Sequence, residues 1–366
     1  MILLFRSNGI FASRVNKYVD YYNKNGLSYR IIGWDRLGEG LSRFNYDFFH
    51  LKTRYVQGGF KAFIAKIKWM RFVYSYLKRY EKEITTIHAC DLDVALPSAF
   101  FKLLHNHKVN LIFDVCDWSS ASVANWLLKL FYMVSERFAV KFSNHMILCE
   151  PERVQQIQFQ LKIPVHIMRN IPSFDNVSFL DEETVPPFNN DNITVAYVGW
   201  FGHGRFLEEL LDYSKCGHIN LNIAGFGLSS IEEYANRLDN SLDNVRFWGK
   251  VDYRFGLQIM KASDLIYAMY CKSIPNHFYA APNKFYESIF LGKPILSTKG
   301  IPLADKINNY ETGFTIEENQ IELSSFFDNI SKKELYESGK KAHLQWPYFS
   351  GLTEEFMNNE YSKMIV

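Results

Sequence analysis

Short apolar runs alternate with longer helical patterns through most of this chain, and no other feature restricts the fold as strongly. The runs at residues 1–5, 86–90 and 110–114 consist mainly of Ile, Leu, Phe and Ala. Strands that are buried on both faces of a parallel sheet have this continuous apolar character. Strands that alternate with helices form βαβ units, so the sequence predicts an α/β protein with parallel sheets.

The alternation stops once and then begins again. Residues 172–187 are rich in Asp, Glu, Asn and Pro, which is typical of a linker. A chain of 366 residues is long for one core and suits two domains. We therefore expect an N-terminal domain at residues 1–171 and a second domain at residues 188–347.

Composition excludes several classes of protein. The apolar content of 48% is too high for a mainly disordered chain. The five cysteines are scattered and include no C-x-x-C pair, so they predict neither a disulfide framework nor a zinc site. A reducing, cytoplasmic setting follows. We find no signal-peptide pattern and no apolar run long enough to span a membrane, so we expect a soluble or peripheral protein.

Charge and motifs limit the classes of ligand that this chain is expected to bind. A net charge of +2 argues against a general nucleic-acid binder. The first strand is not followed by G-x-G-x-x-G, which disfavours a dinucleotide-dependent oxidoreductase. Residues 52–82, however, mix many basic side chains with Trp, Phe and Tyr. This segment is compatible with contact with an anionic membrane surface or with a core helix that has a solvated basic face.

The segment 281–298 carries the strongest functional signal. Pro282 is suited to the first position of a helix, and the free N–H groups of that first turn form a site for a diphosphate. Asn283, Lys284 and Glu287 then lie on one face of the helix, and Gly292 ends it. This arrangement predicts a nucleotide-sugar site; an ordinary capped helix is the alternative.

The series Pro-Asn-Lys-x-x-Glu before a Gly-Lys-Pro turn resembles the retaining glycosyltransferases of family 4. That family has the GT-B fold, in which two Rossmann-like domains with parallel sheets face each other across a cleft. The family has two glutamates eight residues apart on this helix. The resemblance implies that Glu287 is the second of them and binds the donor ribose, while Tyr279 occupies the position of the first. It also implies a UDP- or GDP-linked donor, no cofactor or metal, and a C-terminal helix at residues 348–366 that packs back on the first domain.

Further donor contacts are implied by the same resemblance. Arg205, after the strand that ends at Gly199, would face the diphosphate, although a surface residue near a helix start is the alternative. Two later strand ends would line the base pocket, with ordinary turn glycines as the alternative, through Gly225, Gly227, Lys250 and Val251.

The first domain is expected to hold the acceptor. Asp117 is our candidate for orienting or deprotonating the acceptor hydroxyl, with Asp114 as second choice and His88 as a further catalytic candidate. Helix caps and a satisfied structural histidine are the alternatives. The loop after the first strand and the following helix are implied to lie near the donor phosphates, through Asn8, Gly9 and Arg14.

These observations predict a glycosyltransferase that moves a sugar from a UDP- or GDP-sugar to a saccharide or lipid-linked acceptor. Retention of configuration and a role in bacterial surface polysaccharide or glycolipid synthesis are part of the expectation. Two alternatives stay open: a nucleotide-sugar epimerase of the same fold, and a catalytically silent scaffold that binds a partner. The expected location is the cytoplasm. Peripheral attachment to the inner face of the cell membrane is a further option.

Overall fold

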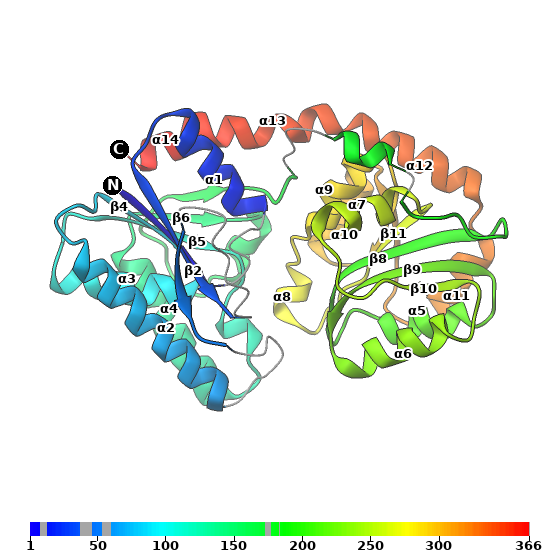
Figure 1. Cartoon of the computed structure of the whole chain (residues 1–366), viewed down its shortest axis with the longest axis horizontal. Coiled ribbons are helices and arrows are strands. Elements are labelled where there is room, and N and C mark those ends of the chain that lie inside the picture. The colour runs from blue at the N-terminus through cyan, green and yellow to red at the C-terminus, as the bar shows by residue number, and fades with distance from the viewer. Residues whose placement is uncertain (8–12, 37–45, 53–59, 173–176, 183, 366) are drawn as a thin grey trace. The chain divides into compact units, whose positions relative to one another are not determined.

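The computed structural model describes residues 1–7, 13–36, 46–52, 60–172, 177–182 and 184–365, which form two compact units (Figure 1). Unit 1 comprises Met1–Asn170 and Leu352–Val366, and unit 2 comprises Ile171–Gly351. Each unit has its own parallel sheet with helices on both faces, so the α/β class expected from the alternating pattern is confirmed.

Unit 1 contains a seven-stranded parallel sheet in the order β3-β2-β1-β4-β5-β6-β7. The strand order reverses direction beside β1, as in doubly wound sheets, where ligands bind outside the carboxyl ends of the strands. The strands are β1 (Ile2–Arg6), β2 (Tyr29–Asp35), β3 (Tyr46–His50), β4 (Thr86–Cys90), β5 (Asn110–Val115), β6 (His145–Leu148) and β7 (Val165–Ile167).

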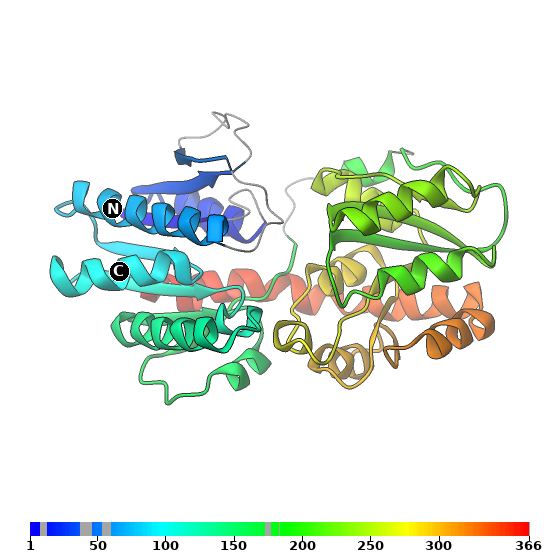
Figure 2. The same ribbon diagram turned by 90° about the horizontal axis from the view of Figure 1, so that it is seen from below.

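Helices cover both faces of this sheet because its strands are apolar on both sides. Ile2 and Leu4 of β1 pack with α1 and the C-terminal segment, whereas Leu3 and Phe5 pack with α2, α3 and α4. Figure 2 shows α2, α3 and α4 side by side. The helices are α1 (Ser13–Lys24), α2 (Phe60–Arg79), α3 (Leu92–Leu104), α4 (Trp126–Phe142), the later part of α13 (Trp346–Phe356), a π turn (Met357–Tyr361) and α14 (Ser362–Met364).

Unit 2 contains a six-stranded parallel sheet in the order β10-β9-β8-β11-β12-β13. Its strands are β8 (Ile193–Phe201), β9 (Ile219–Gly227), β10 (Val245–Phe247), β11 (Leu265–Ala268), β12 (Ile295–Thr298) and β13 (Gly313–Ile316). Its helices are α5 (Leu207–Ser214), α6 (Ser229–Asp239), α7 (Tyr253–Lys261), α8 (Pro275–Phe278), α9 (Asn283–Leu291), α10 (Pro302–Asn309), α11 (Gln320–Asn329) and α12 (Lys332–Leu344).

Strands β8 and β9 extend further than the sequence pattern predicts. The extra pairs include Gly199 with Gly225 and Phe201 with Gly227, so the first strand of unit 2 continues past Gly199 to Phe201. A Cβ atom on Gly225 would lie 1.8 Å from the carbonyl oxygen of Gly199, and Gly225 has a φ of 147°. The close approach of the two strands therefore requires glycine at this position.

The start of α9 also differs from the expectation by one residue. Pro282 has extended backbone angles (φ −74°, ψ 140°) and stands immediately before the helix, which begins at Asn283. Gly292 ends the helix in the left-handed conformation with φ 64°, as expected. The first turn thus starts at Asn283, and Lys284 and Glu287 remain one turn apart on the same face.

Candidate functional site

The N-terminal turn of α9 in unit 2 carries a buried carboxylate. The side chain of Glu287 is only 4% exposed, and its Oε1 accepts a hydrogen bond of 2.9 Å from the hydroxyl of Tyr253. Burial raises the pKa of Glu287, while Lys284 and the Tyr253 hydrogen bond oppose that rise. A carboxylate has acceptor sites for several hydrogen bonds, so Glu287 can also accept them from the hydroxyl groups of a ribose.

Lys284 brings a cation to the same place. Its Nζ lies 4.8 Å from the centre of the Tyr197 ring, and a Cβ atom on Gly199 would come within 2.8 Å of that Nζ. The missing side chain of Gly199 therefore leaves space for the ammonium group. Burial lowers the pKa of Lys284 to about 8; Glu287 acts against this shift and Arg205 adds to it.

Arg205 supplies a second cation. Its guanidinium lies 4.4 Å from the centre of the Tyr270 ring, and its buried Nε has no hydrogen-bond partner among the described residues. A buried N–H without a partner is costly, and an anionic oxygen would satisfy it. The charges of both Arg205 and Glu287 act on the ammonium group of Lys284. The structure thus brings together three residues that the sequence pattern predicted for the donor site: Arg205, Lys284 and Glu287.

The other residues predicted to bind the donor are either explained by packing of the strands or exposed. Gly225 and Gly227 are explained by the close approach of β8 and β9, so they need no ligand to account for them. Asn283 is exposed at the first position of α9, and Lys250 is exposed with its Nζ 5.3 Å from the Phe226 ring. Val251, which follows Lys250 in the sequence, is half-buried. Their contact with a nucleotide base remains a prediction.

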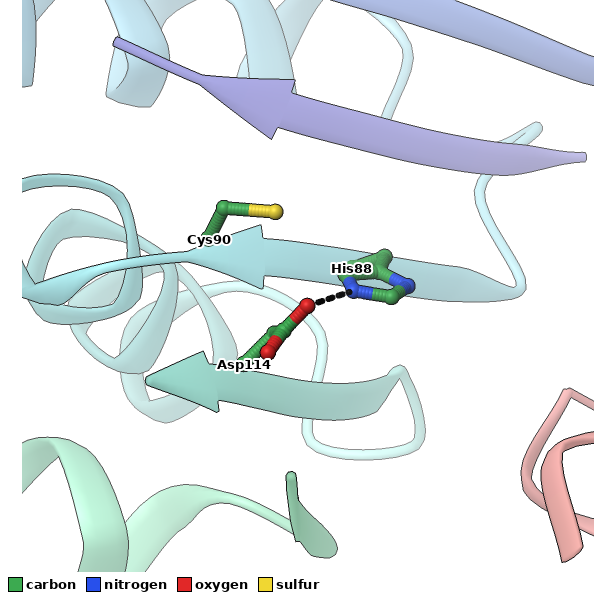
Figure 3. Close-up of side chains that lie close together, drawn as sticks. All are labelled: His88, Cys90 and Asp114. Atoms are coloured by element: carbon green, nitrogen blue, oxygen red, sulfur yellow. Dashed lines mark hydrogen bonds and ion pairs between the residues drawn. The ribbon is translucent and has the colours of Figure 1, made fainter. Parts of the chain in front are cut away.

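In unit 1, a buried network corrects three assignments. Arg14 donates two short hydrogen bonds to Asp114, of 2.6 Å from Nη2 and 3.0 Å from Nε, and Tyr18 donates a third of 3.0 Å. His88 contacts Asp114 through Nε2 at 3.3 Å (Figure 3) and the hydroxyl of Tyr361 through Nδ1 at 2.7 Å. Asp114 and His88 are fully buried, and Arg14 is nearly so.

This network is structural. Burial opposes ionisation of Asp114, but Arg14 and the hydrogen bond from His88 outweigh it and hold the pKa of Asp114 well below its usual range. Burial also lowers the pKa of His88. Asp114 and His88 are therefore closed off from solvent, which argues against their predicted role at an acceptor hydroxyl. The Arg14 guanidinium is held by Asp114, the carbonyl of Met168 and Asn170, which accounts for its charge and its N–H groups within unit 1. Asn8 and Gly9 lie outside the described residues.

His88, Cys90 and Asp114 have the chemistry of metal ligands, and one ligand atom of each lies within 4.8 Å of the others (Figure 3). Both oxygens of Asp114 already accept hydrogen bonds from Arg14, and both ring nitrogens of His88 have protein partners. A second positive charge would also lie beside the Arg14 guanidinium. The donor set is thus already used within the protein and does not fit a metal site.

A pocket of about 240 Å³ lies in unit 1, at the carboxyl ends of the central strands. Asp117 is one of its lining residues, with 64% of its side chain exposed, and it is held by an ion pair of 2.8 Å to Nη2 of Arg153. The lining residues are Ser7, Lys66, Met70, Asp91, Leu92, Asp93, Asp117, Ser119, Ser122, Val123 and Tyr132.

Neither the known family models nor the curated proteins match this sequence, whereas solved structures match it along nearly its whole length. Sucrose-phosphate synthase from Thermosynechococcus elongatus aligns with a TM-score of 0.77 at 13% identity, covering 99% of this chain and 98% of that chain. HepE from Anabaena, solved with UDP and glucose, aligns with a TM-score of 0.66 at 13% identity, covering 99% of both chains. The chain has the GT-B fold.

The GT-B fold also occurs outside the transferases. A UDP-N-acetylglucosamine 2-epimerase aligns with a TM-score of 0.56 at 7% identity, covering 95% of this chain and 96% of that chain. Likeness at such low identity establishes the fold, so function has to be argued from the site residues. None of the helices formed by the described residues has the length and apolar character that crossing a membrane requires.

Two acidic residues of the GT-B chain's first unit were missed as site candidates. Asp91 has a φ of 66°, its carboxylate accepts a 3.0 Å hydrogen bond from the N–H of Cys116, and burial raises its pKa to about 7 against the opposing effect of Arg6. Asp93 is buried, and its Oδ1 has no hydrogen-bond partner in the part of the chain that the structure describes. Their position directly after the buried strand at residues 86–90 was the available signal.

The titration of Lys284 gives a pH prediction for binding of a nucleoside diphosphate. Affinity should fall as the pH rises through about 8, because the ammonium loses its proton there and no longer attracts the anion. Binding near that pH should take up a fraction of a proton, which calorimetry in two buffers of different ionisation enthalpy measures. Lys284→Arg keeps its charge and should flatten the pH dependence. An unchanged pH profile in that variant would contradict the prediction.

Proposed function

We propose that this protein is a glycosyltransferase that takes a UDP- or GDP-linked sugar and transfers it to a saccharide or lipid-linked acceptor. The observation that carries the proposal is the convergence of Arg205, Lys284 and Glu287 at the start of α9. HepE, which shares the fold, was solved with UDP and glucose, and this supports a nucleotide-sugar donor.

The chemistry of the cluster suits departure of a nucleoside diphosphate. Negative charge grows on the diphosphate as its bond to the sugar breaks, and fixed positive groups that face it lower the barrier. Arg205, Lys284 and the free N–H groups of the first turn of α9 are those groups. They supply the charge that a metal ion supplies in other transferases, so we propose a metal-independent reaction. Glu287 would hold the ribose hydroxyls.

The acceptor is assigned to unit 1. Its pocket is lined by three aspartates and three serines. The carboxylates can accept hydrogen bonds from sugar hydroxyls, and the serine hydroxyls can donate or accept them. Asp117 is the exposed carboxylate among them and is fixed by Arg153, so we propose that it orients or deprotonates the acceptor hydroxyl.

We further propose that configuration at the anomeric carbon is retained and that the product belongs to a bacterial surface polysaccharide or glycolipid. The resemblance around Glu287 supports both statements. Proton NMR of the product would assign its anomeric configuration. The epimerase alternative is separated by incubation with the nucleotide sugar alone, because an epimerase would interconvert the donor without any acceptor.

The decisive experiment measures ligand affinity in two variants. Lys284→Ala removes a charge-assisted contact worth roughly 1.5–3 kcal/mol, so affinity for a nucleoside diphosphate should fall about 10- to 100-fold, while affinity for the free nucleoside stays unchanged. Glu287→Gln keeps the shape but loses the charged acceptor, so it should weaken nucleoside and nucleoside diphosphate alike. Calorimetry with both ligands distinguishes the two variants.

A matched control is Lys340→Ala, which removes an exposed lysine from α12 in the same unit. It should bind both ligands as the unaltered protein does. Unchanged affinities in folded Lys284→Ala and Glu287→Gln would remove α9 from the donor site. Donor binding without turnover on any acceptor would favour the silent scaffold.

A further inference from the structure

The outer side of α4 presents a stripe of exposed apolar side chains. They are spaced one, three and four residues apart, so they share one side of the helix. Trp126 is 70% exposed, which is unusual for the largest apolar side chain. The stripe consists of Trp126, Leu127, Leu130, Phe131 and Val134.

Helix α2 carries a similar group. Phe63, Ile64 and Ile67 are exposed near its beginning. Helix α2 connects β3 to β4 and α4 connects β5 to β6. All four strands belong to one parallel sheet, and the two helices pack on the two sides of α3, so they run in the same direction on one face of the sheet (Figures 1 and 2). The Nζ of Lys66 in α2 lies 5.9 Å from the Tyr132 ring of α4, which shows that the two helices also approach each other. Their apolar groups therefore lie at the same end of the layer.

Exposed cations follow the apolar groups along each helix. On α4, Arg137 and Lys141 continue the same side of the helix as the apolar stripe. On α2, the corresponding residues are Lys68, Arg71, Lys78 and Arg79.

No exposed acidic side chain belongs to either helix among the described residues. Helix α2 contains no Asp or Glu, and the single acidic residue of α4, Glu136, is buried and accepts a 2.9 Å hydrogen bond from the N–H of Ser120. The face combines apolar side chains with uncompensated positive charge. A second copy of the same face would be repelled by this charge, whereas an anionic surface with an apolar interior complements both features.

We propose that this α2/α4 face docks unit 1 on an anionic lipid bilayer, with Trp126, Leu127, Leu130 and Phe131 entering the boundary between headgroups and acyl chains. The basic ends of the helices contact the headgroups. The sequence pattern pointed to residues 52–82 alone; the structure adds α4, whose apolar side chains are the more exposed. This docking does not depend on the identity of the donor or the acceptor.

Vesicle flotation tests the proposal with the full chain. Vesicles of phosphatidylcholine and phosphatidylglycerol in equal parts should carry the protein upward, and vesicles of phosphatidylcholine alone should carry much less. Raising the salt from about 0.1 M to about 1 M shortens the Debye length from about 10 Å to about 3 Å and should weaken the binding. Fluorescence should shift to the blue on binding, and brominated lipid should quench it; both signals should shrink in Trp126→Phe.

Two pairs of substitutions separate the apolar and the charged contributions. Trp126→Ser with Leu130→Ser should lower binding to the anionic vesicles about tenfold or more. Arg137→Gln with Lys141→Gln should lower it by a similar factor and reduce its salt dependence. The control pair Ile321→Ser with Leu344→Ser, at positions 81% and 76% exposed in unit 2, should bind as before.

The contrary outcomes are equally definite. Equal binding to neutral and anionic vesicles, no binding to either, or unchanged binding in the folded Trp126→Ser/Leu130→Ser variant would overturn the proposal. Sedimentation that shows a dimer abolished by the same pair would assign the face to a second copy instead. Since all the substituted side chains are exposed, thermal unfolding should show that each variant remains folded.

Discussion

Asp117→Asn should fold, bind the donor normally and transfer sugar about 10²- to 10⁴-fold more slowly, the usual contribution of a general base. Asparagine keeps the oxygen that contacts Arg153, so the local geometry should persist, while the charge that attracts the acceptor proton is lost. The measurement is the turnover number under saturating donor, with donor affinity determined separately by calorimetry.

The control for Asp117→Asn is Asp243→Asn, an exposed aspartate in unit 2, which should leave turnover unchanged. Near-normal turnover in folded Asp117→Asn would remove Asp117 from the reaction. Asp91→Asn would then be the next variant, because burial places the pKa of Asp91 at about 7, close to the value suited to a base at neutral pH.

Arg14→Met should destabilise unit 1 by about 3–5 kcal/mol, because it leaves the buried carboxylate of Asp114 without its counter-charge. The pKa of Asp114 is depressed in the folded protein, so the pair stabilises it above about pH 4, and that stabilisation is lost as the pH falls through the folded-state pKa. The loss of thermal stability in Arg14→Met should therefore be full at neutral pH and shrink as the pH falls below about 4. Scanning calorimetry at several pH values measures it.

Two further variants test whether the effect of Arg14→Met comes from the lost ion pair with Asp114. Arg71→Met removes an exposed arginine from α2 and should change the melting temperature little. The double variant Arg14→Met/Asp114→Leu removes both charges and should recover part of the lost stability. A melting temperature unchanged by Arg14→Met at neutral pH would show that the ion pair between Arg14 and Asp114 does not stabilise unit 1.

Local pattern was sufficient for the fold class and for the donor helix. Continuous apolar runs specify buried strands, and their alternation with helices leaves parallel sheets as the way to bury both faces. The group at α9 was also visible in advance, because Lys284 and Glu287 are three residues apart and helix geometry alone places them together. The start of α9 differed by only one residue, since an extended Pro282 and a helical one are hard to distinguish from sequence.

Contacts between distant residues could be assigned only in three dimensions. Arg14 and Asp114 are 100 positions apart, and their pairing turned two proposed site residues into a structural bridge. Burial likewise separated Asp114 from Asp117, although only two residues lie between them, because alternate positions at a strand end can point into the core or out to solvent. The glycines of β9 and the exposed side of α4 depend on which elements pack against them, and that is a property of the assembled sheet layers and not of any local stretch of sequence.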